Sequence, residues 1–125
     1  MTKVLIIDDD QGITDMFRLA LPLKGFKVAA ANSGREGIEA VRQHEPDVII
    51  LDLMIPDIDG WQVCKAIREF SQVPILILSA VIDPDKIDLV KQQGANAYLA
   101  KPAGLDQLVA SLRKLTASEK SRTAV

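Results

Sequence analysis

The stretch Pro46-Asp-Val-Ile-Ile-Leu-Asp52 places the aliphatic run Val48–Leu51 directly before an aspartate. A strand with one face in water would alternate polar and apolar residues, and this run does not. It therefore predicts a strand buried on both faces, as in a parallel sheet. Comparable short runs recur along the chain, and each predicts one further strand: Val4–Ile7, Val28–Ala31, Ile75–Leu78 and Tyr98–Ala100.

Between and after these runs, apolar residues repeat at spacings of three and four, which is typical of amphipathic helices. A capping box at Ser33 and Glu36 and the pair Asp83-Pro84 are helix start signals. Pro22 cannot donate a backbone hydrogen bond, so we expect the first helix to kink or end there. The predicted helices lie around Ile13–Ala20, Ile38–Val41, Val63–Phe70, Ile87–Val90 and Leu105–Leu112.

The alternation of strands and helices predicts an α/β fold, a (βα)5 doubly wound parallel sheet of five strands. Right-handed crossovers place helices on both faces of such a sheet. A closed barrel needs about 200 residues or more, and this chain has 125. We expect one domain over residues 1–118 and a polar C-terminal tail over residues 119–125.

The composition argues against several classes of protein. With 15 basic and 17 acidic residues the net charge is −2, so direct binding to nucleic acid or to a membrane surface is not expected. No apolar run reaches the roughly 18 residues of a membrane span. Cys64 is the single cysteine, which excludes an intramolecular disulfide. We expect a cytoplasmic domain.

Chemically reactive side chains follow the predicted strands. In open α/β sheets, ligands bind beyond the carboxyl ends of the strands. The residues at these ends are Asp8-Asp9-Asp10, Asp52, Ser79 and Lys101-Pro102, whereas Asn32-Ser33 after the second strand offers nothing reactive. We therefore expect carboxylates, a hydroxyl and an ammonium group to converge at one edge of the sheet.

This set of groups suits phosphoryl transfer. Clustered acids repel one another unless a cation lies between them, and oxygen-only ligands favour Mg²⁺. A carboxylate can attack phosphorus and form an aspartyl-phosphate. Lys101 could supply charge and Ser79 a hydrogen bond to the phosphoryl oxygens.

The chain resembles a response-regulator receiver domain of two-component signalling, from about Lys3 to Leu115. The resemblance rests on four motifs in order: VLIIDDD (4–10), PDVIILDLMIPDIDG (46–60), ILILSA (75–80) and GANAYLAKP (94–102). It implies the strand order 2-1-3-4-5 of flavodoxin-like sheets. Two positions depart from the usual pattern: Ala103-Gly104 replaces a phenylalanine after Lys-Pro, and Ser79 replaces the commoner threonine.

The resemblance implies roles for the residues that match the motifs. Asp52 matches the phospho-acceptor, and Asp8 and Asp9 match the acidic pair that holds Mg²⁺ together with the backbone carbonyl of Met54. Lys101 matches the lysine that pairs with the phosphoryl oxygens.

The remaining matched positions belong to the switch. Ser79 matches the hydroxyl residue that follows the phosphoryl group, and Ala80 a small residue that leaves room for it. Tyr98 matches the aromatic residue whose rotamer reports activation, and Pro102 a proline that usually follows a cis peptide bond.

The expected function is a phosphorylation-dependent signalling switch rather than an enzyme. A sensor histidine kinase or a histidine phosphotransfer protein would donate the phosphoryl group to Asp52. The resulting population shift would change the face made by the helix around Ile87–Val90, the strand Tyr98–Ala100 and the helix around Leu105–Leu112, and so control an output partner.

The winged-helix transcription-factor subfamily dimerises through ion pairs on this face. Ala97, Gln107 and Ser111 replace those charges here, so we expect a monomer, or a dimer through a different face.

Other interpretations stay open at this point. A dehalogenase-type small-molecule phosphatase also uses an aspartyl-phosphate and Mg²⁺, but it would need an Asp-x-Asp at the first strand and a longer chain. A flavodoxin-like FMN carrier would need a phosphate loop rich in Ser, Thr or Gly. A degenerate receiver that serves only as an interaction platform is a third alternative.

We expect Asp57 and Asp59 to be solvated turn residues, and Cys64 to be a packed apolar residue.

Overall fold

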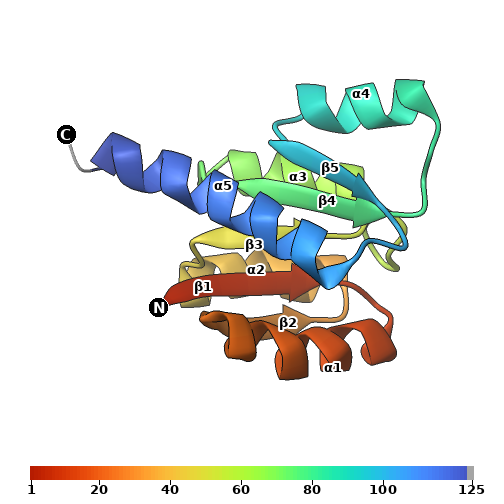
Figure 1. The fold of residues 1–125 in the computed structure, drawn as a ribbon. Coiled ribbons are helices and arrows are strands. Elements are labelled where there is room, and N and C mark those ends of the chain that lie inside the picture. The colour runs from red at the N-terminus through yellow and green to blue at the C-terminus, as the bar shows by residue number, and fades with distance from the viewer. Residues whose placement is uncertain (124–125) are drawn as a thin grey trace.

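The computed structural model describes residues 1–123, in which five strands alternate with helices (Figure 1). Strand β3 has the predicted bounds, and the other strands differ from the predicted runs by one or two residues at an end. The elements in chain order are β1 (Thr2–Ile7), α1 (Gln11–Ala20), η1 (Leu21–Lys24), β2 (Phe26–Ala31), α2 (Gly34–His44), β3 (Val48–Leu51), α3 (Gly60–Arg68), β4 (Ile75–Ser79), α4 (Pro84–Gln92), β5 (Ala97–Ala100) and α5 (Leu105–Thr123).

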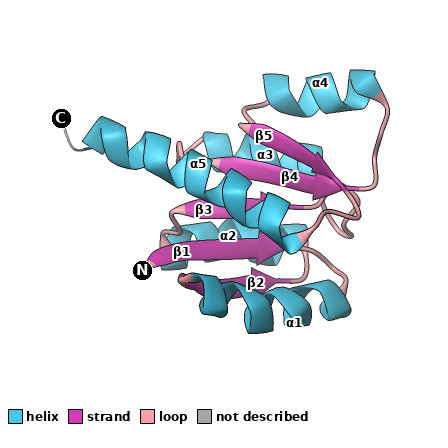
Figure 2. Ribbon diagram, viewed as in Figure 1, coloured by secondary structure: helices cyan, strands magenta, loops and turns pink. Residues whose placement is uncertain are grey.

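The strands form one parallel sheet in the order β2-β1-β3-β4-β5, as expected. Helices α1 and α5 cover one face, and α2 and α3 cover the other, where buried Val90 of α4 joins the same cluster near the β5 edge (Figure 2). In the register, Ile7 of β1 pairs with Leu51 of β3. The residues that follow these two strands therefore begin at the same level of the sheet edge.

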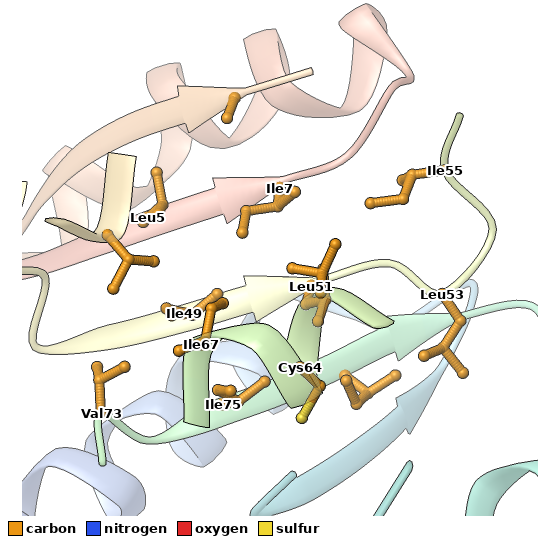
Figure 3. Packing of buried hydrophobic residues seen from close by; sticks show 14 of the residues in the cluster. Leu5, Ile7, Ile49, Leu51, Leu53, Ile55, Cys64, Ile67, Val73 and Ile75 are labelled. Atoms are coloured by element: carbon orange, nitrogen blue, oxygen red, sulfur yellow. The ribbon is translucent and has the colours of Figure 1, made fainter. Parts of the chain in front are cut away.

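A hydrophobic core fills each face of the sheet. On one face, Cys64 and Ile67 of α3 pack against Ile49 and Leu51 of β3 (Figure 3). On the other face, Phe17 of α1 belongs to the same cluster as strand residues of β1, β3 and β4 and apolar residues of α5. Burial on both faces explains why the central strands are continuous aliphatic runs.

The local start and stop signals act as predicted. Ser33 accepts a hydrogen bond from the Glu36 N–H, and Asp83 caps α4. Glu36 itself accepts from the Asn32 N–H and so completes a variant of the capping box. Helix α1 ends at Ala20, and Pro22 lies in the 3-10 helix that follows.

The C-terminal segment continues the last helix. The backbone of α5 is helical to Thr123, so most of the segment 119–125 that we expected as a polar tail extends α5. Residues 124–125 of that tail lie outside the described part of the chain. Among the helices within residues 1–123, none has both the length and the hydropathy to cross a membrane.

Candidate functional site

Two aspartates and a lysine meet at the carboxyl edge of the sheet. Asp8 follows β1, Asp52 follows the neighbouring strand β3, and Lys101 follows β5. The Lys101 Nζ lies 2.9 Å from Asp8 Oδ2 and 3.0 Å from Asp52 Oδ2. The carboxylate side chains are only 4% and 8% exposed, against 21% for the lysine. A single ammonium group therefore bridges two nearly buried carboxylates.

The charges of this cluster are not balanced. Burial raises the pKa of Asp8, and the negative charge of Asp52 adds to that effect, while the Asp10 N–H and Lys101 oppose it. Burial opposes the charge on Lys101 too, yet hydrogen bonds and Coulomb attraction from Asp8 and Asp52 raise its pKa above the ordinary value. Because one ammonium group is shared by two carboxylates, the cluster has fewer positive than negative groups.

The same edge offers a set of oxygen ligands. Carboxylate oxygens of Asp8, Asp9 and Asp52 lie within 4.8 Å of one another, and Asp9 is exposed to solvent. The Met54 N–H donates to Asp52 Oδ1 at 3.2 Å, which fixes the carboxylate, and the Met54 side chain is exposed. Carboxylates of this kind, with one side open to water, suit a hard divalent cation.

Hydrogen bonds link Tyr98 of β5 to the end of β4, where Ser79 lies, and to the segment that follows it. Ser79 is fully buried, and its Oγ accepts a hydrogen bond of 3.4 Å from the Val81 N–H. The Tyr98 hydroxyl donates to the carbonyls of Ser79, at 3.3 Å, and of Val81. Burial raises the pKa of Tyr98, with a contribution from Asp52. Ala80, which lies between Ser79 and Val81 in the sequence, is exposed. The Tyr98 hydroxyl is thus bonded to the backbone on both sides of Ala80.

Several supporting contacts were not foreseen from the sequence. Asn32, which seemed to offer nothing reactive, donates from Nδ2 to the Asp8 carbonyl at 2.9 Å. The exposed turn residues Asp57 and Asp59 both cap helices. Asp59 accepts from the Gln62 N–H at the start of α3, whereas Asp57 accepts from backbone N–H groups of α2. The only sequence signal for Asn32 was its place directly after a strand.

Two other positions, Cys64 and Pro102, match the expectations from the sequence. Cys64 is buried, and burial raises the pKa of its thiol, so it is a packed core residue. The Lys101–Pro102 peptide bond is cis, as the resemblance implied. Trp61 is half-buried at the start of α3, and its Nε1 donates to the Lys86 carbonyl of α4 at 2.9 Å.

Residues 4–113 match the family model of the response regulator receiver domain. The chain belongs to this family. The receiver domain is 40% identical to the transcriptional regulatory protein AfsQ1 of Streptomyces coelicolor over 102 residues, which covers 82% of this chain and 45% of that protein. It is 40% identical to the transcriptional regulatory protein KdpE of Mycobacterium tuberculosis over 114 residues, 90% of this chain and 50% of that protein. The chain thus spans about half the length of these curated relatives.

Solved structures of receiver domains have the same fold. A two-component response regulator from Clostridium difficile is 30% identical, with a TM-score of 0.89 over 92% of this chain and 95% of that one. The chemotaxis protein CheY4 of Vibrio cholerae is 35% identical, with a TM-score of 0.87 over 92% and 98%. Family membership makes this receiver domain a signalling domain rather than a classical enzyme.

Proposed function

We propose that this receiver domain is a phosphorylation-dependent switch whose phospho-acceptor is Asp52. The observation that carries the proposal is the double ion pair of Lys101, which holds Asp52 beside Asp8 at the open edge of the sheet. Asp52 Oδ1 accepts a hydrogen bond from the Met54 N–H and Oδ2 accepts one from Lys101. The carboxylate is therefore oriented before a phosphoryl donor arrives. Such preorganisation is what phosphoryl transfer requires of a protein.

The donor would be the phosphohistidine of a sensor histidine kinase or of a histidine phosphotransfer protein. An Asp52 carboxylate oxygen attacks phosphorus, the P–N bond breaks, and the freed imidazole takes up a proton. An acyl phosphate on Asp52 is the product. The Lys101 ammonium, 3.0 Å from Asp52 in the resting state, would then face phosphoryl oxygens.

Mg²⁺ fits the donor set at this edge. Asp8, Asp9 and Asp52, with the Met54 carbonyl, would hold it, because carboxylate oxygens of the three aspartates lie within 4.8 Å of one another. When bound, the ion would supply charge that stabilises the phosphoryl oxygens. Lys101 and the Met54 N–H would still orient Asp52.

The switch itself would use Ser79, Ala80 and Tyr98. The buried Ser79 hydroxyl would turn toward the phosphoryl group, and small Ala80 would leave room for it. Because Tyr98 bonds to the carbonyls of Ser79 and Val81, the movement would reach β5 and the face formed by α4, β5 and α5. That face would bind the output partner in the cytoplasm. We expect no direct contact with nucleic acid or membrane.

Acetyl phosphate tests the proposal without a kinase. The protein is incubated with acetyl phosphate and Mg²⁺, and its intact mass is measured. One phosphoryl group, labile to base, is expected in the wild type and in the control Asp59→Asn, which keeps a helix-capping side chain. Asp52→Asn should gain none, as should the wild type in EDTA. A phosphoryl group that persists in Asp52→Asn contradicts the assignment.

A further inference from the structure

The junction between β2 and α2, residues Asn32–Arg35, contacts both of the loops that carry the acidic cluster. Asn32 Nδ2 donates to the Asp8 carbonyl at 2.9 Å. The N–H groups of Gly34 and Arg35 donate to the Asp57 carboxylate at 3.0 and 3.4 Å. Asp8 begins the loop between β1 and α1, and Asp57 lies in the loop that follows Asp52. The junction thus supports two loops although none of its side chains belongs to the cluster.

On the first loop, Asn32 completes the anchoring of the Asp8 backbone. The Asp8 N–H donates to the Ala31 carbonyl at 3.1 Å, and the Asp8 carbonyl accepts from Asn32. Both peptide groups that flank the Asp8 side chain are therefore held by residues 31–32. Asn32 is in turn held on α2, because its N–H donates to Glu36 Oε2 at 3.3 Å. This anchoring sets the direction of the Asp8 carboxylate and the start of the Asp9 peptide.

On the second loop, Asp57 holds the segment that leaves the phospho-acceptor. Its φ of +64° lies in the left-handed region, which an aspartate adopts only at some cost. The carboxylate lies at the positive end of α2, and its Oδ2 is also 3.8 Å from the Arg35 Nε. Desolvation acts to raise the pKa of the exposed Asp57, but hydrogen bonds from the N–H groups of Ile58, Arg35 and Gly34 together outweigh it and lower the pKa.

The loop packs directly against the helix start. A Cβ at Gly34 would lie 2.6 Å from the Ile58 carbonyl oxygen and 2.9 Å from the Val63 Cγ2. No side chain fits between the junction and the loop at this point. A shift of the junction would therefore move the loop, and the loop carries the Met54 peptide whose N–H binds Asp52.

We propose that Asn32 and Asp57 are positioning residues for the metal site, with the junction Asn32–Arg35 as their common support. The inference rests on the proposed function, since it assumes that Asp8, Asp9 and Asp52 bind a divalent cation. Neither residue is a proposed ligand, and both act through the backbone of the ligand loops. Partners that orient metal ligands in this way are typically worth about 10- to 100-fold in metal affinity.

The experiment measures cation affinity and stability side by side. Free Mn²⁺ is counted by electron paramagnetic resonance during titration of the metal-free protein, and Mg²⁺ is then added as a competitor. Urea unfolding in EDTA gives the free energy of unfolding. Asn32→Ala and Asp57→Ala should each raise the dissociation constant for Mn²⁺ about 10-fold. Asp57→Asn, which keeps an acceptor and tolerates positive φ, should recover most of the affinity.

Ser33→Ala is the matched control. Ser33 lies in the same junction and caps the same helix, through the Glu36 N–H at 3.2 Å, and its recorded hydrogen bond reaches neither ligand loop. It should lower stability and leave the dissociation constant within about twofold. If Ser33→Ala weakens Mn²⁺ binding as much as Asp57→Ala, the effect is loss of the helix start and the inference is overturned.

The remaining outcomes separate this inference from the proposed function. If the wild type binds Mn²⁺ and the variants Asn32→Ala and Asp57→Ala bind it with the same affinity, only the positioning role is overturned. A wild type that binds no Mn²⁺ overturns the metal site in the proposed function as well. If an alanine variant does not fold, Asn32→Ser, which is too short to reach the Asp8 carbonyl, and Asp57→Gly, which tolerates the positive φ but lacks the carboxylate, take its place. Affinities equal to the wild type in both would then refute the inference.

Discussion

Replacing Lys101 by methionine removes the only positive charge recorded in contact with Asp8 and Asp52 among the described residues. Methionine has a similar length and keeps the apolar stem, so the change isolates the ammonium group. Both carboxylates are more than nine-tenths buried and would face each other without compensation. We therefore expect Lys101→Met to destabilise the fold in the absence of divalent cations.

The expected magnitude follows from the burial of the pair. Removing one partner of a fully buried ion pair costs about 3–5 kcal/mol. Lys101 is 21% exposed, and water can partly solvate the carboxylates once the ammonium is gone. We therefore expect a loss of about 2 kcal/mol in the free energy of unfolding at neutral pH.

The loss should depend on pH. The pKa of Asp8 is already raised by burial, and removal of Lys101 raises it further. A carboxyl with a raised pKa contributes stability at low pH, and that contribution is lost as the pH rises through the folded-state pKa. The variant should therefore approach the wild type as the pH falls from neutral toward about 4, where carboxyls take up protons.

Urea unfolding in EDTA, monitored through the fluorescence of Trp61, measures the loss in unfolding free energy and its dependence on pH. The wild type and Lys101→Met are compared at neutral and acidic pH, and then with Mg²⁺ added. A cation at about 100 times its dissociation constant stabilises a protein by about 2.7 kcal/mol, and the gain should be larger in the variant, where no ammonium competes. Equal stability of the two proteins in EDTA at neutral pH would refute the reasoning.

Three further predictions concern packing, the thiol and assembly. Gly60→Ala would place a Cβ 2.5 Å from the Asp52 carbonyl oxygen, so it should lower the free energy of unfolding in urea by about 1–3 kcal/mol and slow labelling by acetyl phosphate. Gly104→Ala is the control, because its Cβ would have nothing within 4 Å, and it should have neither effect. The Cys64 thiol is buried and its pKa is raised, so a thiol reagent should label it only on unfolding, and fast labelling in native buffer would contradict the packing. Ultracentrifugation should find a monomer, or a dimer through a different face, with and without beryllofluoride, and a beryllofluoride-driven dimer centred on Ala97, Gln107 and Ser111 would contradict that expectation.

The sequence by itself determined the fold and the composition of the site. Continuous aliphatic runs such as Val48–Leu51 require burial on both faces, and this requirement leads to a parallel sheet with crossover helices. Asp8, Asp52 and Lys101 could be assigned to one edge because each directly follows a strand. Ser33 and Asp83 could be assigned as caps because a capping side chain bonds within its own helical turn.

Only the tertiary structure decided which groups meet at that edge. The sequence placed Lys101 at the same edge as the acids. It did not show that the lysine bridges Asp8 and Asp52, which lie 93 and 49 positions away along the chain. Asn32 and the Asp8 carbonyl are 24 positions apart, and Asp57 and the Gly34 N–H are 23 positions apart. Hydrogen bonds at such separations depend on the register of β1 with β2 and on the packing of a loop against α2. Periodicity and local propensity describe a residue's own element, so they carry no information on these pairings.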